Sequence, residues 1–290
     1  MNYNHQNKII QDDPKKCGLF LGTGSGKTRI ALMLAQGKTL IVAPKTQIED
    51  KNWERENKKV GKDITVISKE KFRTTWDELP MFNTVIVDEA HTAVGCSPMM
   101  RWRNKKRIPV TSQIFDALRL FLKKQGPERI YLVTATITRN PMCCWSAGLL
   151  LGKTWDFYAF RSMFYFKLPT QRELWAVKKD KKTKELLGKT VRNIGYTGKL
   201  DDFFDVPLQT YRTVYVELTQ EQKQLIEQLP MEYPDPLVCV GKQHAMENGI
   251  IIGNEFKETQ YLENKKMDTL LIYAKMYPKL IIFAKYIAQI

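Results

Sequence analysis

Short apolar runs alternate with amphipathic stretches over the first half of the chain. The apolar runs cover residues 17–21, 39–44, 63–68, 84–88 and 129–136, and the run that begins at Thr84 is rich in β-branched residues. Runs of this length, bounded by turn residues, are typical of buried strands. Helical spacing lies between them, most clearly in residues 112–125, which stop at Gly126. Strands that alternate with helices predict an α/β fold, with a parallel sheet and helices on both faces.

The pattern changes after about residue 141. Residues 141–151 and 155–166 are predicted to be helical, and their aromatic side chains are most simply explained as core. Residues 172–200 contain two possible strands around a run of lysines at 178–184. We interpret this segment as an exposed hairpin whose tip is solvated, with contact to a nucleic-acid backbone as the alternative.

The last third again mixes strand and helix signals. Residues 211–218 alternate as a strand does, and Thr219 with Gln222 forms a capping box for a helix that continues to Leu229. Residues 261–276 show helical spacing, and another apolar strand is predicted immediately after them.

The composition limits the class of protein. Hydrophobic residues make up 43% of the 290 residues, so the chain is neither disordered nor fibrous. Lysine and arginine number 46 against 31 acidic residues, which gives a net charge of +15 and a pI near 9.5. This excess favours a polyanionic partner, and nucleic acid is the leading candidate, although anionic membrane surfaces also attract basic chains.

No membrane segment or secretion signal is expected. The apolar residues at 270–290 are interrupted by lysines and a proline, and the first residues are polar. Five cysteines without metal-ligand spacing indicate reduced thiols, and Cys143 and Cys144 are interpreted as packing residues. We therefore expect an intracellular protein, cytoplasmic or nucleoid-associated.

A glycine-rich loop follows the first predicted strand and precedes a helix. Its glycines let backbone N–H groups turn inward, and the helix N-terminus adds partial positive charge, so the loop predicts a phosphate cradle for ATP. Lys27 would reach the β- and γ-phosphates, and the Thr28 hydroxyl would hold Mg²⁺. The usual template has its first glycine where this chain has Leu21, and a turn without a ligand is the alternative. The candidate nucleotide-binding residues are Gly22, Thr23, Gly24, Ser25, Gly26, Lys27 and Thr28.

Two carboxylates end the strand predicted at residues 84–88. Asp88 is placed to bind Mg²⁺ through water, and Glu89 to orient and deprotonate an attacking water. Such a pair is often only a solvated loop, but its position after a phosphate loop favours nucleotide hydrolysis over a kinase reaction. The candidate catalytic residues are therefore Lys27, Asp88 and Glu89.

These motifs occur in an order that resembles the superfamily-two helicases, closest to the Swi/Snf-type DNA translocases and their phage and large-virus relatives. Residues 22–28 match the first helicase motif, and Asp88-Glu-Ala-His91 is similar to a DEAH box. The resemblance implies that Gln6 reads adenine. It also implies that His91, Thr134 and Thr136 couple the state of the nucleotide to strand contacts.

The resemblance also implies a surface that contacts nucleic acid, with DNA favoured over RNA. Residues 41–46 and 52–55 resemble the motif that touches a strand, and the candidate contacts at predicted strand ends are Lys45, Thr46, Ser68 and Lys69. Residues 101–107 interleave an aromatic with basic residues. Here phosphate contact with stacking on an aromatic ring and a solvated loop remain equal alternatives for Arg101, Trp102 and Arg103.

The resemblance gives a division into three parts. Residues 1–152 are predicted to form a first RecA-like ATP-binding lobe, 153–260 a helical and hairpin insertion with a linker, and 261–290 the beginning of a second RecA-like lobe. A strand at 279–284 would open that lobe. In the family the second lobe supplies arginines that stabilise the transition state. We expect either an ATP-driven translocase or helicase whose arginine comes from a missing lobe or another chain, or a nucleotide-gated binding module without efficient turnover.

Overall fold

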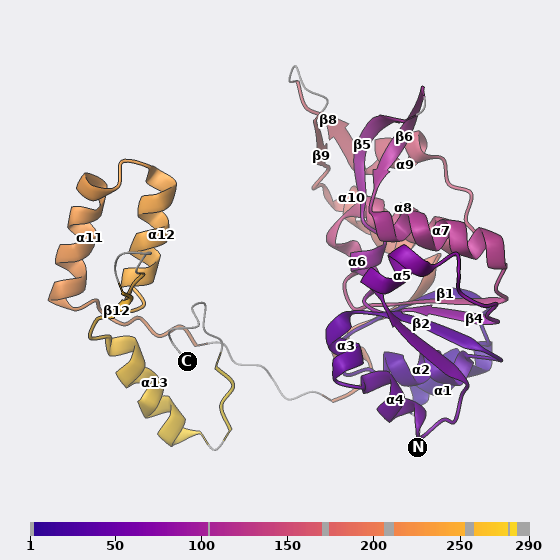
Figure 1. Cartoon of the computed structure of the whole chain (residues 1–290), viewed down its shortest axis with the longest axis horizontal. Helices are drawn as coiled ribbons and strands as arrows, with labels where there is room; N and C mark the ends of the chain where they lie inside the picture. The colour runs from indigo at the N-terminus through magenta and orange to yellow at the C-terminus, as the bar shows by residue number, and fades with distance from the viewer. Residues whose placement is uncertain are drawn as a thin grey trace. The chain divides into compact units, whose positions relative to one another are not determined.

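The chain folds into two compact units, Met1–Pro207 and Leu208–Ile290 (Figure 1). A computed structural model describes residues 3–103, 105–169, 174–205, 212–252, 258–277 and 279–282. The predicted domain boundary at residue 152 falls inside the first unit, where helices and a strand from residues 153–207 pack with the preceding residues. The division into three domains stays a prediction.

A parallel sheet of six strands organises the first unit. Its order is β10–β1–β7–β4–β2–β3, and every neighbouring pair is parallel. The strands are β1 (Lys16–Leu21), β2 (Thr39–Ala43), β3 (Ile64–Ser68), β4 (Thr84–Val87), β7 (Arg129–Val133) and β10 (Gly195–Gly198). The predicted α/β fold and five predicted strands are confirmed. β10 lies within residues 172–200, where two strands were thought possible, but its place in this sheet was not predicted, because its sequence Gly-Tyr-Thr-Gly contains no apolar run.

Helices cover both faces of this sheet, as predicted (Figure 1). Alternate strand residues point to opposite faces, so Leu19 and Phe20 belong to two separate core clusters. The face of Leu19 is covered by α1 (Asn4–Asp12), α2 (Lys27–Leu34) and α4 (Asn52–Asn57). The face of Phe20 is covered by α5 (Lys69–Thr75), α7 (Gln113–Gln125), α8 (Pro141–Leu150), α9 (Phe157–Phe164) and α10 (Lys181–Arg192).

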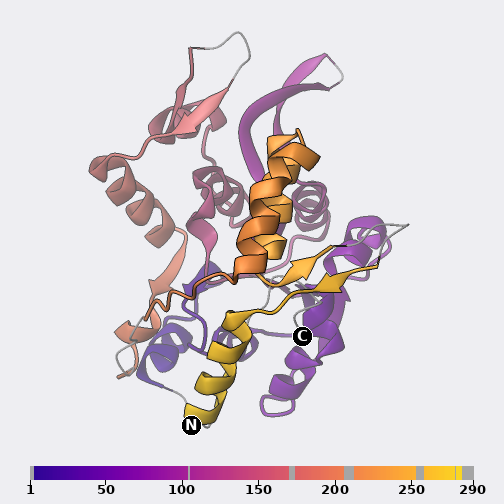
Figure 2. The same cartoon turned by 90° about the vertical axis from the view of Figure 1, so that its left-hand side faces the viewer.

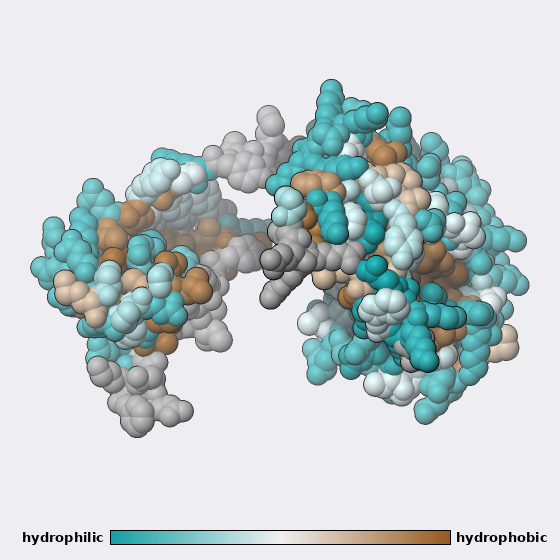
Figure 3. Space-filling model, turned by 90° about the horizontal axis from the view of Figure 1, so that it is seen from above, coloured by the Kyte–Doolittle hydropathy of each residue, from teal (hydrophilic) through white to brown (hydrophobic). Residues whose placement is uncertain are grey.

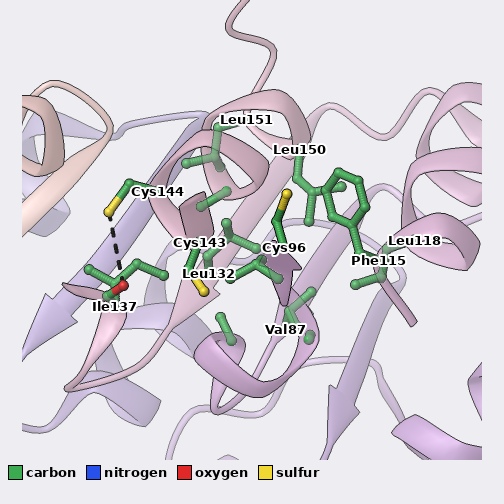
Figure 4. Close-up of a cluster of buried hydrophobic side chains, with 14 of the residues drawn as sticks. Val87, Cys96, Phe115, Leu118, Leu132, Ile137, Cys143, Cys144, Leu150 and Leu151 are labelled. Atoms are coloured by element: carbon green, nitrogen blue, oxygen red, sulfur yellow. Dashed lines mark hydrogen bonds between the residues drawn. The ribbon is translucent and has the colours of Figure 1, made fainter. Parts of the chain in front are cut away.

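Cysteines fill part of the larger core cluster. Cys96, Cys143 and Cys144 are buried there among aliphatic and aromatic side chains, and Cys144 Sγ lies 3.9 Å from the carbonyl oxygen of Ile137 (Figure 4). Burial raises the pKa of the Cys96 and Cys144 thiols to about 12. The packing role predicted for Cys143 and Cys144 agrees with this position.

An ion pair holds the end of α1 against the sheet. Arg129, at the start of β7, donates from both terminal nitrogens to the Asp13 carboxylate, at 2.7 and 2.9 Å. This bidentate contact lowers the pKa of the Asp13 carboxyl. Tyr131 on the same strand donates to the carbonyl oxygen of Pro14 at 3.0 Å. The end of α1 is therefore fixed beside the start of β7, just before β1 begins.

The lysines of the run from residue 181 onward lie in the helix α10, so the predicted hairpin at this position is wrong. Asp180 caps α10 by accepting from the backbone N–H of Thr183. Thr183, Leu187 and Val191 then recur every four residues and face the core, while the lysines lie on the other side. The apolar positions were obscured by the charges between them.

Two antiparallel hairpins extend away from the sheet (Figure 2). One joins β5 (Cys96–Arg103) to β6 (Lys106–Thr111), and the other joins β8 (Tyr165–Lys167) to β9 (Trp175–Val177). The basic segment at residues 101–107, for which a loop was one expectation, lies at the outer end of the first hairpin. Short α3 (Lys45–Glu49) and α6 (Ala90–Ala93) follow β2 and β4 directly.

The second unit consists mainly of helices. They are α11 (Gln220–Glu232), α12 (Pro236–Met246) and α13 (Lys265–Met276), with a short ladder between β11 (Ile250–Ile251) and β12 (Gln260–Tyr261). The capping box of Thr219 and Gln222 is present. Apolar side chains such as Met231 and Leu237 are exposed in this unit, and Figure 3 shows brown patches on its surface. No helix in the described ranges of either unit is long and apolar enough to cross a bilayer.

Three local predictions in the second unit change. Described residues 212–218 form no strand, because the alternating pattern has no neighbouring strand there to pair with. Residue 211 lies outside the described residues. α11 continues past Leu229 through Pro230 to Glu232. Residues 279–282 are irregular, and the remainder of the strand predicted at 279–284 lies outside the described residues.

We predict that Phe121→Ala destabilises the first unit by about 3–5 kcal/mol, because it removes a buried ring and leaves a cavity. Phe121 is fully buried and packs edge to face on Phe72 at 5.2 Å. Leu120→Ala, at a neighbouring residue of α7 that is 47% exposed, should cost less than about 0.5 kcal/mol. Urea unfolding followed by tryptophan fluorescence measures this unit, because all six tryptophans lie in it. Equal losses in both variants would contradict the prediction.

Candidate active site

The glycine-rich loop connects β1 to α2 at the carboxyl end of the sheet. Gly24 and Gly26 have φ values of +82° and +79°, in the left-handed region that side chains disfavour. Gly22 donates its N–H to the carbonyl oxygen of Gly198 at 2.8 Å, so the end of β10 supports the loop. Gly26 then caps α2, which begins at Lys27. The loop is a tight turn whose exposed backbone includes Thr23 and Gly24.

Lys27 folds over this loop. Its ammonium donates to the carbonyl oxygen of Gly22 at 2.9 Å. Burial lowers the pKa of Lys27, and the carboxylates of Glu89 and Asp88 oppose that change. Thr28 follows in the first turn of α2 and is half-buried. A cation therefore lies between the loop and the two predicted carboxylates.

Residues of α1 hold the loop from the other side. Gln6 is buried, donates from Nε2 to the carbonyl oxygen of Ser25 at 3.0 Å, and accepts from the N–H of Tyr3 at 3.2 Å. The ring of His5 also contacts that Ser25 oxygen, at 2.9 Å, and stacks on Phe203 at 4.1 Å. Within the described residues, the buried hydroxyl of Ser25 has no hydrogen-bond partner.

A cleft of about 520 Å³ lies beside the loop. It is lined by polar residues from α1, the loop and the helices that follow: Tyr3, Gln6, Gly24, Gly26, Lys27, Thr28, Arg29, Gln47, Asn52, Glu56 and Lys59. A second cleft, of about 480 Å³, lies among the starts of β1 and β10 and is away from these residues. The cleft that contains the predicted loop residues is therefore the candidate site.

Asp88 follows β4 and is almost fully buried. Its Oδ2 accepts from Nε1 of Trp53 at 2.9 Å, and its Oδ1 accepts from the N–H of Glu89 at 2.9 Å. Burial raises the pKa of Asp88, whereas these two donors favour the carboxylate. Trp53 was expected within a strand-contacting motif, yet it is buried and holds this carboxylate in one orientation.

Glu89, Thr134 and His91 form a connected group at the ends of β4 and β7. Thr134 Oγ1 lies 2.9 Å from Nδ1 of His91 and 3.4 Å from Oε2 of Glu89, and the same carboxylate oxygen lies 3.3 Å from the His91 ring. The N–H of Thr136 donates to Thr134 Oγ1 at 3.2 Å. All three residues predicted to couple sites thus lie in one group with the predicted base.

Lys69 occupies a position at odds with its predicted contact to nucleic acid. It is only 8% exposed, and its ammonium donates to the carbonyl oxygen of Glu89 at 2.8 Å and to Oγ1 of Thr92 at 2.6 Å. Burial lowers the pKa of Lys69 to about 8. Lys69 lies on the buried face of α5, so its ammonium contacts the backbone of the acidic pair and is not on the surface.

The other predicted contacts at strand ends lie closer to the surface. Lys45 and Thr46 are exposed at the start of α3, and Lys45 is 3.6 Å from Glu49. Ser68 pairs in register with Ala43 and caps α5 through its hydroxyl, which accepts from the N–H of Lys71. These residues come from the neighbouring strands β2 and β3 and are away from the glycine-rich loop in the sheet order.

The predicted contacts at residues 101–103 lie on β5 and are not part of the cleft. Trp102 is 72% exposed and pairs in register with Arg107, while Arg101 lies opposite Ile108 and 3.8 Å from Asp116. Arg103 is exposed beside them. This hairpin end presents an aromatic ring among positive charges.

Sequence reasoning missed the supporting contacts of the site. Trp53 on Asp88, Lys69 on Glu89 and the β10 segment on the loop each join residues far apart in the chain. No local pattern marks such contacts.

Comparison with known proteins finds a likeness among solved structures. No protein-family model matches the sequence, and no curated protein matches it. The helicase domain of Hef from Pyrococcus furiosus is similar, with 18% identity and a TM-score of 0.35. The alignment covers 53% of this chain and 39% of that domain, so this chain spans well under half of its length. At this level the likeness concerns the fold alone.

We predict that Gly26→Ala lowers the free energy of unfolding by more than Gly61→Ala does. Both glycines have positive φ, so each substitution should cost about 1 kcal/mol in backbone strain. A Cβ at Gly61 meets open space, whereas one at Gly26 would lie 2.3 Å from Nε2 of Gln6 and break its bond to Ser25, a further loss of about 1 kcal/mol. Urea unfolding of the two variants measures the difference. Identical midpoints would refute the proposed support by Gln6.

Proposed function

We propose that this chain binds ATP with Mg²⁺ at the loop after β1, hydrolyses it, and couples hydrolysis to movement on nucleic acid as a translocase or helicase. One observation carries the proposal. The glycine-rich loop, the Asp88–Glu89 pair and Thr134 meet at the carboxyl ends of the adjacent strands β1, β7 and β4. Ligands of open parallel sheets bind at this edge.

The loop residues fit a chain of phosphates. Gly24 and Gly26 keep the backbone free of side chains, and the first turn of α2 presents unpaired N–H groups. Lys27 supplies a positive charge that can exchange the Gly22 carbonyl for a phosphate oxygen. The adjoining cleft of about 520 Å³ is within the range of small-molecule sites. Gln6, which lines it, is the proposed adenine contact.

Thr28 and Asp88 are the proposed ligands of Mg²⁺. A hydroxyl and a carboxylate are ligands that this ion accepts while it keeps waters and phosphate oxygens. Trp53 and the N–H of Glu89 orient the Asp88 carboxylate, so an ion would meet a fixed group. When bound, Mg²⁺ would neutralise charge on the β- and γ-phosphates.

Glu89 is the proposed general base. Its side chain is 42% exposed, so water can reach it, and Oε2 is held near Thr134 and His91. A carboxylate in that position can orient and deprotonate an attacking water. Through the contact of His91 with Thr134, a change at Glu89 would reach the segment after β7. We propose that His91, Thr134 and Thr136 transmit the nucleotide state in this way.

Nucleic acid is the proposed partner, with DNA favoured over RNA by the resemblance of the motifs. The net charge of +15 supports a polyanion. Lys45, Thr46 and Ser68 are the proposed contacts at the ends of β2 and β3. An arginine from a second lobe or another chain is proposed to complete the stabilisation of the transition state.

The deciding experiment is ATP turnover by this chain, with and without duplex DNA, beside Glu89→Gln. We expect DNA to stimulate turnover, and we expect Glu89→Gln to bind nucleotide as the wild type does while turnover falls by roughly 10²–10⁴-fold, because the amide cannot accept a proton. Labelled-nucleotide binding and phosphate release measure the two quantities.

Three results would count against this function. Unchanged turnover in Glu89→Gln would remove Glu89 from the role of base. Tight binding of ATP without turnover in the wild type would favour the nucleotide-gated binding module. The absence of any nucleotide binding would refute the site itself.

We predict a separate effect for Trp102 on the β5–β6 hairpin. Stacking of a base on an aromatic ring contributes about 1–3 kcal/mol, so Trp102→Ala should weaken binding of single-stranded DNA by roughly 5–150-fold. Met81→Ala is the matched control, because Met81 is similarly exposed at 71%. Fluorescence anisotropy of a labelled oligonucleotide measures both affinities. Equal affinities for the two variants would leave this hairpin as a solvated surface.

A further inference from the structure

Lys69 is a buried cation, and no carboxylate of the described residues lies within hydrogen-bonding distance of its ammonium. Two of its three N–H donors are directed to the carbonyl oxygen of Glu89 and the hydroxyl of Thr92, at 2.8 and 2.6 Å. An ammonium is costly to bury, and lysines that serve only packing normally carry the charge to solvent. The contacts of Lys69 therefore need an explanation beyond the packing of α5.

The acceptor of this lysine is an unusual backbone position. Glu89 has a φ of +41°, in the left-handed region that a residue with a side chain rarely adopts. Such conformations persist where surrounding contacts hold them. Lys69 supplies a contact at the Glu89 carbonyl, and Thr92 donates to the same oxygen at 2.9 Å. Lys69 thus donates to the Glu89 carbonyl oxygen and also to the Thr92 hydroxyl, which itself donates to that carbonyl oxygen.

The charges around Lys69 favour the ammonium in this place. Asp88 and Glu89 follow β4, and Glu70 is adjacent on α5; the carboxylates of all three attract it. The Glu89 side chain leaves the same residue toward Thr134 and His91. The backbone conformation that Lys69 holds is therefore the one that directs the Glu89 carboxylate.

We propose that Lys69 is a positioning residue, which fixes the backbone of Glu89 so that its carboxylate points to Thr134 and His91. The catalytic consequence rests on the proposed hydrolysis, whereas the positioning itself does not. The hydrogen bonds of Lys69 go to Glu89 and Thr92, and neither is proposed to bind the nucleotide. Its loss should lower the rate of the chemical step and leave nucleotide binding largely unchanged.

The test compares Lys69→Met with Lys71→Met, Lys69→Arg and Thr92→Val in the full chain. Met keeps the length of the stem and removes the donors. Lys71 is exposed on the same helix, so its substitution controls for a lost charge. Arg retains donors at the buried position. Val keeps the shape of threonine and removes one acceptor of the lysine.

Two readouts separate positioning from stability. The first is steady-state ATP turnover, divided into kcat and KM, beside the affinity for nucleotide. The second needs no nucleotide: the ring-proton NMR signals of His91, which lies 3.3 Å from the Glu89 carboxylate. The chain has three histidines, so the signals can be assigned with a His91→Gln variant.

We expect Lys69→Met to lower kcat by roughly 10²-fold, with KM and nucleotide affinity within about 2-fold, because a displaced base reacts slowly. The His91 signals should shift in Lys69→Met and stay in place in Lys71→Met, while the His244 signals stay unchanged in both. Lys69→Arg should restore part of kcat. Thr92→Val should shift the His91 signals in the same direction by a smaller amount.

Unmoved His91 signals in folded Lys69→Met would overturn the proposal, as would an equal loss of kcat in Lys71→Met. If Lys69→Met does not fold, Thr92→Val decides by the same readouts, and unmoved signals there overturn it. A wild type without turnover would refute the proposed hydrolysis alone, because the His91 signals still test the positioning.

Discussion

The parallel register of three central strands is the constraint on which the candidate site depends. Leu19 of β1 pairs with Val133 of β7, and Val87 of β4 pairs with Leu132 of the same strand. Because these strands run in one direction and end within a few residues of each other, the chain leaves all of them at one edge. The loop, the acidic pair and Thr134 are neighbours for that reason, although more than 100 residues of sequence lie between the first and the last. Burial of both sheet faces maintains this register.

Elements with strong local signals could be predicted from the sequence. The five predicted strands β1, β2, β3, β4 and β7 are apolar runs that stop at turn residues or carboxylates, and the loop at residues 22–28 follows the first of them, so the fold and the place of the site followed together. Weak local signals failed. β10 lacks an apolar run, and α10 hides three core positions among lysines. Residues 212–218 have the alternation of a strand without a neighbour to pair with, so pattern alone misled.

The layer behind the site could not be predicted, because it is made of long-range contacts. Trp53 reaches Asp88 across 35 positions, and Lys69 reaches Glu89 across 20. Both join a helix to the residues that follow β4, and only the finished sheet brings them together. A basic residue near a strand end has the same appearance in the sequence whether it faces solvent or the core. Lys45 and Lys69 illustrate the two outcomes, and burial alone separates them.

The contacts that hold the glycine-rich loop affect the order in which the parts of the chain fold. The loop is held by His5 and Gln6 from one side and by Gly198 from the other, and the ring of Phe203 completes the stack on His5. A nascent chain presents its residues to folding from the N-terminus onward. The strands β1, β2, β3, β4 and β7 are synthesised well before residue 198. We therefore expect the sheet to assemble first on the ribosome, with the loop gaining its final shape only as β10 arrives. A polypeptide that ended between these points would contain the other five strands without the contact of Gly198 that supports the loop.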